Sequence, residues 1–452
     1  MSRSRWHLWA FLAALLRHRW GFRFRNRAAL EAFQQRRLRR FLKRALRAPF
    51  YRNRNRSLTA WQTLPITDKE TMLGSFHSFN TVGVTLEQAR RVALEAEETR
   101  NFRTTLPKGL TVGSSSGTSG RPSIFLVSPH ERAQWAGAVL GRMLSVASMS
   151  RILNPFARSL RIAFFLRANS NLYTTLNGWR IRFRFFDLAQ PVGAHLASLN
   201  EFQPDILVAP ASILRHFADW QKRHLISIRP AQVINVAECL EPDDAKVISD
   251  AFGSRPQQIY QCTEGVLGFS CQAGSIHLNE ECVYIEPQWL DNKRTRFSAL
   301  VTDFCRSTQM FVRFRMDDIL HVDPTPCACG RITLRLRSIE GRADEVLWLP
   351  SRGSMAELMP VFPDQVRRAV MLAAPDCPDY QIEQREFILK LATAEGRPAD
   401  LIAIRKALSA LFDGLNLQSN SIEYGEWRPI PAAAKRRRIR CITRPHTMAR
   451  SA

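Results

Sequence analysis

The sequence predicts an α/β protein in which one large domain is followed by a smaller α+β domain. At 452 residues the chain is longer than the about 250–300 residues at which a single hydrophobic core stops growing. From Leu110 onward, short apolar runs alternate with helical stretches, which is typical of an α/β fold with mostly buried strands. Residues 341–452 have strand and helix patterns of their own, so we place the domain boundary at residues 341–344.

Residues 1–56 form a strongly basic N-terminal arm. They hold 17 Lys and Arg residues and one acidic residue, Glu31, in a chain whose net charge is +25. Residues 435–452 hold seven Lys and Arg and no acid, so the body between the two ends has a net charge of only +2. A nucleic-acid-binding face would be spread over the folded body and interleaved with stacking aromatics. We therefore expect no nucleic acid among the partners.

The arm begins with a mostly apolar stretch, residues 6–16, which is followed at once by Arg17, His18, Arg19 and Trp20. It is too short to span a bilayer, which takes about 20 residues, and no small-x-small cleavage site follows it. Two interpretations remain: residues 1–28 form an amphipathic basic helix on an anionic membrane surface, or a helix docked on the folded body. With nine cysteines in so long a chain and no export signal, we expect a cytoplasmic protein, peripheral to the inner face of the membrane on the first interpretation.

Residues 30–51 predict the next element, an amphipathic helix. Apolar residues recur at helical spacing among arginines, from Leu30 and Phe33 to Phe41 and Leu42. Five later apolar runs predict buried strands of the large domain: residues 161–166, 206–209, 232–236, 258–260 and 299–302.

A run of hydroxyl side chains, glycines and one arginine lies between the arm and these five strands. Its members are Ser115, Ser116, Gly117, Thr118, Ser119, Gly120 and Arg121. Glycines let backbone N–H groups approach an anion, hydroxyls donate to phosphate oxygens, and Arg121 supplies fixed charge. The order fits neither the Walker loop nor the dinucleotide-binding glycine pattern. Taken alone, the run is either a phosphate-binding loop or a flexible Ser/Gly surface loop.

Four blocks downstream favour the phosphate loop. They are residues 260–265 (YQCTEG), 313–318 (RFRMDD) and 340–345 (EGRADE), and Lys435, which follows the residues IPAAA. In this order and spacing they resemble the motifs of the adenylate-forming (AMP-binding) superfamily of acyl- and aryl-CoA ligases. Within it the chain is similar to the phenylacetate–CoA ligase-like branch, which includes a coenzyme adenylate synthetase. The resemblance covers roughly residues 30–440.

The resemblance implies an adenylation domain at residues 57–340 and a C-terminal domain, residues 341–452, that rotates about a hinge. A small-molecule carboxylic acid and ATP would give an acyl- or aryl-adenylate and pyrophosphate, and a thiol, expected to be that of coenzyme A, would displace AMP. Two alternatives stay open. One is transfer of AMP to a hydroxyl of a coenzyme, and the other is a catalytically degenerate protein that binds membrane or nucleic acid through its basic ends.

The resemblance assigns three parts of the chain to the phosphates of ATP. Residues 115–121 would cradle the triphosphate, Glu264 would orient Mg²⁺, and Thr263 would touch the α-phosphate. A carboxylate and a set of donors are the groups that this charge distribution requires. The alternative for Glu264 alone is an ordinary surface carboxylate.

Four more residues are implied for the adenosine. Tyr260 and Glu238 would lie beside the adenine, while Asp318 would accept both ribose hydroxyls and Arg342 would donate to the same sugar. The sequence departs from the family pattern at three positions that are adjacent to Glu238 or Asp318: Ala237 replaces a glycine, Cys239 a proline and Asp317 a glycine.

The cation of the first step is expected to be Lys435, a mobile point charge on the rotating domain, with Asp344 at the hinge. Alanines 432–434 stand where the family has a Gly-rich pair. By itself, a lysine followed by three arginines would be interpreted as part of a solvated basic tail.

A set of cysteines and one histidine predicts a structural zinc site. Cys327 and Cys329 form a C-x-C turn, and Cys271 and His277 flank a glycine-containing turn upstream. Three thiolates and an imidazole suit tetrahedral zinc, and the alternative is four reduced, partly buried side chains. Some phenylacetate–CoA ligase-like proteins carry a similar cluster here, so the resemblance favours zinc.

Overall fold

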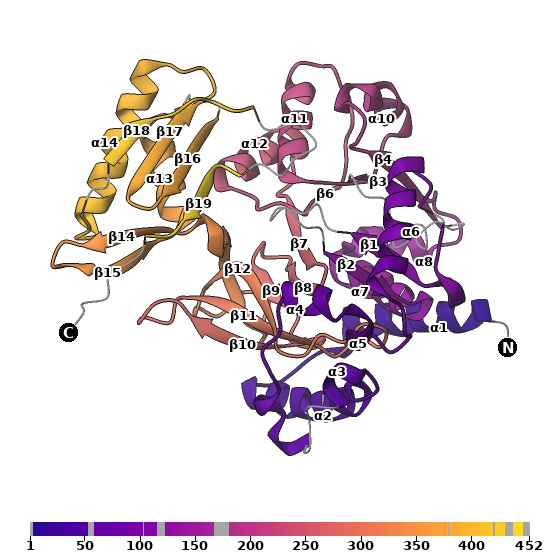
Figure 1. The fold of residues 1–452 in the computed structure, drawn as a ribbon. Coiled ribbons are helices and arrows are strands. Elements are labelled where there is room, and N and C mark those ends of the chain that lie inside the picture. The colour runs from indigo at the N-terminus through magenta and orange to yellow at the C-terminus, as the bar shows by residue number, and fades with distance from the viewer. Residues whose placement is uncertain are drawn as a thin grey trace. The chain divides into compact units, whose positions relative to one another are not determined.

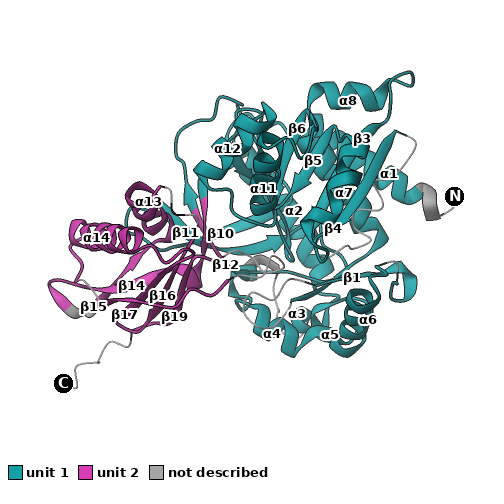
Figure 2. Cartoon of the chain, turned by 90° about the horizontal axis from the view of Figure 1, so that it is seen from above, with its two compact units in different colours: residues 1–316, 321–338 teal, residues 317–320, 339–452 magenta. Residues whose placement is uncertain are grey.

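The computed structural model describes residues 3–52, 58–102, 104–114, 123–166, 180–375, 377, 379–418, 421–429 and 437–445. The chain divides into two compact units (Figure 2). Unit 1 comprises residues 1–316 and 321–338, and unit 2 comprises residues 317–320 and 339–452. A large mixed α/β unit is therefore followed along the chain by a smaller one, as the sequence predicts.

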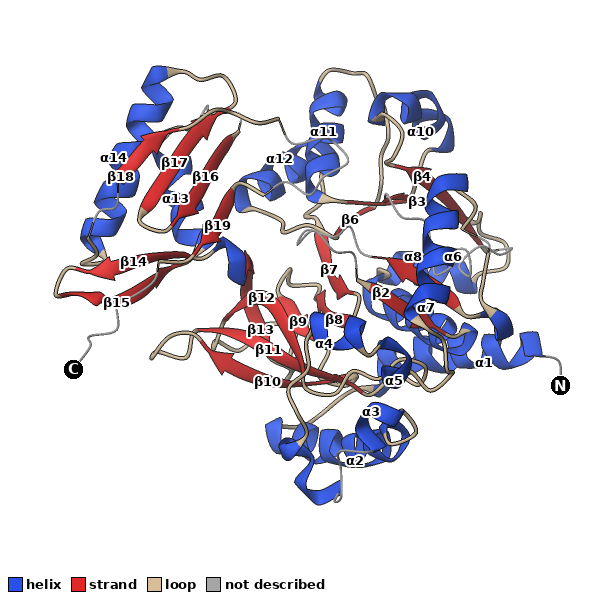
Figure 3. Cartoon of the chain, in the orientation of Figure 1, coloured by secondary structure: helices blue, strands red, loops and turns tan. Residues whose placement is uncertain are grey.

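A mixed sheet forms the centre of the larger unit (Figures 1 and 3). Within the described residues it has 11 strands in the order β10-β11-β12-β13-β9-β8-β7-β6-β5-β3-β4. The strands from β4 to β7 are parallel, and β7, β8, β9 and β13 pair antiparallel. The parallel strands are β3 (Leu160–Leu166), β4 (Ile181–Asp187), β5 (Ile206–Ala209), β6 (Gln232–Val236) and β7 (Gln257–Cys262). The others are β8 (Gly265–Ser270), β9 (Ile276–Leu278), β10 (Val283–Trp289), β11 (Arg296–Asp303), β12 (Phe314–Val322) and β13 (Arg335–Arg342).

Alternation along the parallel strands builds a core on each face of the sheet. Ile162, Ile206 and Ile234 belong to one core cluster, and their neighbours Ala163, Leu207 and Val233 belong to the other. Helices cover both faces, so the strands read as near-continuous apolar runs. The predicted strands at 161–166, 206–209, 232–236, 258–260 and 299–302 are confirmed as β3, β5, β6, β7 and β11.

Two groups of helices cover these faces. The first cluster takes side chains from α1 (Arg3–Leu16), α7 (Pro129–Met143) and α8 (Val146–Leu153). The second takes them from α10 (Leu196–Phe202), α11 (Ala211–Lys222) and α12 (Pro242–Phe252).

The N-terminal helix α1 packs along α7, and a π-helical turn, η1 (Arg17–Gly21), follows it. Two glycines of α7, four residues apart, make the close approach possible. A Cβ atom at Gly137 would lie 2.9 Å from Ala14 Cβ, and one at Gly141 would lie 2.6 Å from the carbonyl oxygen of Leu15. Residues 3–21 are thus docked on the folded body. Among the described helices, none is long and apolar enough to cross a membrane.

The predicted amphipathic helix is confirmed as α2 (Arg27–Ala45), followed by α3 (Pro49–Arg52). Asn26 caps it, since its side-chain oxygen accepts a hydrogen bond of 2.9 Å from the backbone N–H of Ala29. The guanidinium of Arg27 forms two hydrogen bonds, of 2.8 and 2.7 Å, with the carboxylate of Glu280. The basic arm is therefore anchored on the body by specific polar contacts as well as by apolar burial.

The remaining elements of unit 1 lie between α3 and β3, except for one short helical turn after β4. They are η2 (Leu58–Thr63), α4 (Lys69–Gly74), α5 (Phe76–Phe79), α6 (Leu86–Thr99), η3 (Pro107–Gly109), β1 (Thr111–Ser114) and β2 (Ile124–Val127), and η4 (Val192–His195) follows β4. Strands β1 and β2 pair antiparallel as a separate two-stranded sheet.

Unit 2 has a core of its own, in which α13 (Pro363–Ala373) and α14 (Pro398–Gly414) pack with strands. Among the described residues, its four-stranded sheet has the order β18-β17-β16-β19. These strands are β16 (Tyr380–Arg385), β17 (Ile388–Thr393), β18 (Ser421–Tyr424) and β19 (Ile439–Thr443). A hairpin of β14 (Leu347–Ser351) and β15 (Ser354–Val361) follows η5 (Ala343–Glu345).

Candidate functional site

The predicted phosphate loop connects the two strands of the β1–β2 hairpin. Ser115, Ser116, Gly117, Thr118, Ser119, Gly120 and Arg121 lie outside the described residues. Both strands that carry the loop are described, and Ser114 pairs with Ile124 in their register. The chain therefore enters and leaves the loop at neighbouring points of a hairpin.

Thr263 and Glu264 form the tight turn between β7 and β8. The hydroxyl of Thr263 donates a hydrogen bond of 2.7 Å to the carboxylate of Glu264, whose side chain is buried, and Tyr260 is buried on β7 just before the turn. The next residue is Gly265, and a glycine is needed there because a Cβ atom would lie 2.5 Å from the carboxylate of Asp303. The structure thus brings the predicted Thr–Glu pair together in one rigid turn.

A fully buried arginine that sequence reasoning missed holds this turn. The guanidinium of Arg306 donates to the carbonyl oxygens of Thr263 and Glu264, the latter at 3.4 Å. Its third donor reaches the carbonyl of Leu126 on β2, at 3.1 Å. The cation also lies 4.6 Å from the ring centroid of Trp135. Arg306 therefore ties the Thr–Glu turn to the strand on which the predicted phosphate loop ends.

Two buried carboxylates face this cation. Asp303 lies 3.9 Å from Arg306, and burial raises the pKa of Asp303 to about 6, although the charge of Arg306 opposes the shift. Burial also acts to raise the pKa of Glu131, but the charge of Arg306 and hydrogen bonds from Thr308 and Ser128 outweigh it and lower that pKa. Glu131 accepts hydrogen bonds from Ser128 at the start of α7 and from the backbone N–H of Thr308, so it links α7 to the segment that carries Arg306.

Glu238 follows β6, and one of its carboxylate oxygens accepts a hydrogen bond of 2.9 Å from the backbone N–H of Ser212 in the first turn of α11. This contact caps the helix and fixes the side chain. Ala237 has a φ of +65°, in the left-handed region that favours glycine. The backbone thus keeps the conformation that a glycine would favour, although alanine occupies the position.

In unit 2, the structure brings together the two residues predicted to bind ribose. The guanidinium of Arg342, at the end of β13, lies 3.8 Å from the carboxylate of Asp318 on β12. Burial acts to lower the pKa of Arg342, but Asp318, Asp317 and further carboxylates outweigh it and raise that pKa. Asp318 and Arg342 thus place an acceptor and a donor side by side, and their role at the ribose stays a prediction.

The predicted hinge residue, Asp344, lies in the helical turn η5. Its carboxylate forms an ion pair of 2.5 Å with Arg437, and Arg437 also lies 3.4 Å from Glu345. Gly341 has a φ of +113°, and a side chain there would collide with the carboxylate of Glu345. Lys435 lies outside the described residues. The chain that carries it is fixed two residues later, because Arg437 is held by the η5 carboxylates.

The predicted Cys/His set is brought together in unit 1. The thiol sulfurs of Cys271, Cys327 and Cys329 and a ring nitrogen of His277 all lie within 4.8 Å of one another. The two sulfurs of Cys271 and Cys327 are 3.7 Å apart, and Cys329 Sγ lies 3.4 Å from His277 Nε2. The carbonyl oxygen of Thr333 lies 3.1 Å from His277 Nδ1 and accepts a hydrogen bond from it, which directs Nε2 at the thiols.

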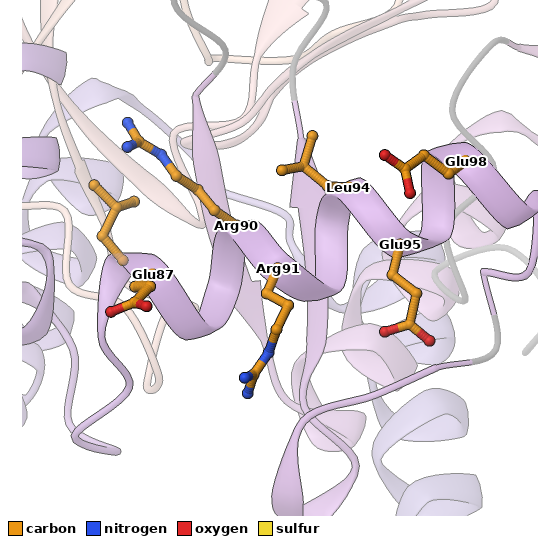
Figure 4. Close-up of a pocket in the computed structure, with 7 residues that line it drawn as sticks. Glu87, Arg90, Arg91, Leu94, Glu95 and Glu98 are labelled. Carbon is orange, nitrogen blue, oxygen red and sulfur yellow. The ribbon is translucent and has the colours of Figure 1, made fainter.

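A hollow along α6 takes no part in these arrangements. Its lining side chains all come from that helix (Figure 4): Leu86, Glu87, Arg90, Arg91, Leu94, Glu95 and Glu98. It contains none of the predicted site residues, so we do not place the candidate site there.

The raised pKa of Asp303 predicts a specific pH dependence of stability. Between an ordinary value near ~3.9 and about 6, the folded protein holds a proton on Asp303 that the unfolded chain has lost. The contribution of Asp303 to the free energy of unfolding therefore falls as pH rises through this window. We expect the stability of Asp303→Asn relative to the natural protein to improve by roughly 2 kcal/mol from pH 4 to pH 6, measured by urea unfolding.

Asp205 provides a control of opposite sign. Burial acts to raise its pKa, but a hydrogen bond from Arg151 and further contacts outweigh this and lower it. The natural protein should therefore gain stability relative to Asp205→Asn as pH rises toward the ordinary carboxylate value near ~3.9, which lies below the window of Asp303. A stability difference for Asp303→Asn that stays constant between pH 4 and pH 6 would contradict the assignment of Asp303.

Comparison with known proteins finds solved structures with a similar fold. No family model matches the sequence, and no curated protein sequence matches it. Among solved structures, 2-hydroxyisobutyryl-CoA ligase in the postadenylation state with 2-HIB-AMP has a TM-score of 0.59 and 17% identity, over 94% of this chain and 91% of that chain. The open conformation of the same enzyme with 2-HIB-AMP and CoA has a TM-score of 0.56 and 16% identity, over 91% of each chain. The chain therefore has the fold of the adenylate-forming ligases that its motifs resemble.

Proposed function

We propose that this protein activates a carboxylic acid with ATP and then transfers the acyl group to a thiol, that of coenzyme A. The observation that carries the proposal is the arrangement around Arg306. One buried cation joins the turn that carries the buried Glu264 carboxylate to β2, the strand that follows the serine-rich loop in the sequence. The fold shared with 2-hydroxyisobutyryl-CoA ligase, whose complexes contain 2-HIB-AMP and CoA, supports this reaction class.

The first step joins the acid to AMP. A carboxylate oxygen of the acid attacks the α-phosphorus of ATP, the bond from that phosphorus to the bridging oxygen breaks, and pyrophosphate leaves. Residues 115–121 hold the triphosphate, and Thr263 contacts the α-phosphate. Mg²⁺, when bound, neutralises charge on the phosphate oxygens. Glu264 offers an oxygen ligand for it, of the kind that Mg²⁺ prefers.

The second step releases AMP. The thiol of coenzyme A attacks the acyl carbonyl, the bond to the AMP oxygen breaks, and the thiol proton passes to solvent. Asp318 and Arg342 hold the ribose, while Tyr260 and Glu238 lie beside the adenine. We assign the hinge between the steps to Asp344. The ion pair of Asp344 with Arg437 is suited to this role, because it couples the turn η5 to the chain that follows Lys435.

Exchange of labelled pyrophosphate into ATP tests the proposal. With a panel of aliphatic, hydroxy and aromatic carboxylic acids, we expect at least one acid to drive Mg²⁺-dependent exchange, because the first step is reversible. Lys435→Ala should slow this exchange by ~10²-fold or more, since the lysine stabilises charge in the first step only. Thioester formation from a supplied adenylate should be largely spared.

Lys406→Ala serves as the matched control, because Lys406 is an exposed lysine of α14 in the same unit. It should leave both half-reactions unchanged. Equal loss of both half-reactions in Lys435→Ala would contradict the role of this lysine. Exchange driven by no acid, with AMP transferred instead to a hydroxyl compound, would establish the coenzyme adenylyltransferase alternative.

We also propose that the Cys/His set holds a structural zinc ion. Zn–S bonds of about 2.3 Å in a tetrahedron place two sulfurs about 3.8 Å apart, close to the 3.7 Å between Cys271 and Cys327. Three thiolates and one imidazole close such a site completely, which is typical of a structural ion. Gly274 and Gly330, with φ of +78° and +72°, allow the two turns that present the ligands.

Metal analysis of the purified protein should therefore find about one zinc per chain. Cys327→Ser and Cys329→Ser should each lose the zinc and lower the melting temperature, because a closed site contributes folding free energy. Cys377→Ser, at a cysteine of unit 2 outside the set, should retain the metal. Zinc-free natural protein, or ligand variants with unchanged melting, would contradict the site.

A further inference from the structure

We propose that the outer face of α1 and η1 is a docking surface for an anionic lipid membrane. The surface is defined by six side chains of the N-terminal helix. Their exposed fractions are 62% for Trp6, 57% for Leu8, 61% for Trp9, 37% for Leu12, 53% for Leu16 and 47% for Trp20. Three tryptophans and three leucines on a single helical segment are an unusual amount of apolar surface to leave in water.

Four members of this surface, Trp6, Trp9, Leu16 and Trp20, lie opposite the face by which the helix is docked, and Leu8 and Leu12 lie on its flank. Phe11, Leu15 and His18 recur at spacings of four and three residues and face the body, where Leu15 joins the core cluster. Trp9, Leu16 and Trp20 recur at spacings of seven and four residues, about half a turn away from the first set. The helix is thus apolar on two opposite faces, and packing among the described residues of unit 1 accounts for only one of them.

Close packing on α7 fixes which face points outward. Gly137 and Gly141 let the backbone of α1 approach α7 closely, and Arg19 donates a hydrogen bond of 2.6 Å to the carbonyl of Leu144 beyond the end of α7. His18 lies 3.5 Å from the thiol of Cys282. Rotation of the helix to bury its tryptophans would break these contacts, so the outer face is held in place for a partner.

Charge identifies that partner as an anionic bilayer. Residues 3–25 contain six arginines and no acidic residue, and Arg17, Arg23 and Arg25 are exposed. Tryptophan rings favour the boundary between headgroups and acyl chains, and guanidinium groups pair with lipid phosphates. An apolar face flanked by cations therefore matches a membrane whose headgroups carry negative charge. A second copy of this chain would bring the same positive charges together.

Vesicle sedimentation of the full chain tests the proposal. We expect the protein to pellet with vesicles of phosphatidylcholine and phosphatidylglycerol, to remain in solution with phosphatidylcholine alone, and to be released by salt. The variant Trp6→Gln/Trp9→Gln/Leu16→Gln should reduce the partition coefficient by roughly tenfold or more. Replacement of Arg17, Arg23 and Arg25 by glutamine should remove the preference for anionic lipid.

A matched control replaces two equally exposed apolar residues of unit 2. Leu372→Gln/Ile402→Gln, at side chains that are 69% and 60% exposed, should bind vesicles like the natural protein. Hydrogen exchange of the natural protein provides a second measurement that needs no substitution. Vesicles should increase protection of residues 6–20, beyond the protection that docking on α7 already gives.

Three results would overturn the proposal. The first is equal sedimentation with neutral and anionic vesicles, and the second is unchanged binding and unchanged protection in the tryptophan variant. The third is a natural protein that dimerises while the tryptophan variant is monomeric and binds lipid equally well, which would assign the face to a second copy. Each result is independent of pyrophosphate exchange, so the docking surface and the proposed reaction fail or stand separately.

Discussion

The buried guanidinium of Arg306 is the contact on which the candidate site depends. It hydrogen-bonds three main-chain carbonyls from two segments, and its charge is balanced by the buried carboxylates of Asp303 and Glu131. Removing such a cation would leave both carboxylates and all three carbonyls without their partner, a change that typically costs several kcal/mol, about 3–5 for a broken buried pair. The turn that presents Thr263 and Glu264 is therefore held from within the core by buried hydrogen bonds. Preorganisation of this kind is what stabilisation of charge at a reacting phosphate requires.

Much of the fold could be predicted because its parallel strands are buried on both faces. Strands such as β5 and β6 are short segments, rich in aliphatic residues, that are buried along their whole length between layers of helices. The N-terminal helix was harder to interpret, since it is apolar on two opposite faces and its partner glycines lie on α7, far away in the sequence. Only the structure shows which of the two faces is docked on the body.

The candidate site could be predicted in part, and the reason differs between residues. Some site residues lie in short motifs that can be recognised in the sequence. They are the Thr263–Glu264 turn, the Asp318–Arg342 pair and the Cys/His set. Arg306 has no such signal, because its partners are main-chain carbonyls and any residue type can supply those. Ala237 is a related case: its departure from glycine is visible in the sequence, but only the φ of +65° shows that the backbone conformation is kept. The loop at 115–121 and Lys435 remain predictions from motif alone.

The account's central claim is that a carboxylate attacks the α-phosphate of ATP at this scaffold. Its most direct test uses the acid that best drives pyrophosphate exchange, labelled with ¹⁸O in its carboxylate, and mass spectrometry of the products after thioester formation. If an acyl-adenylate forms, one labelled oxygen remains with phosphorus when the thiol displaces AMP, so the account predicts labelled AMP and unlabelled pyrophosphate. Unlabelled AMP, or label found in inorganic phosphate, would contradict it.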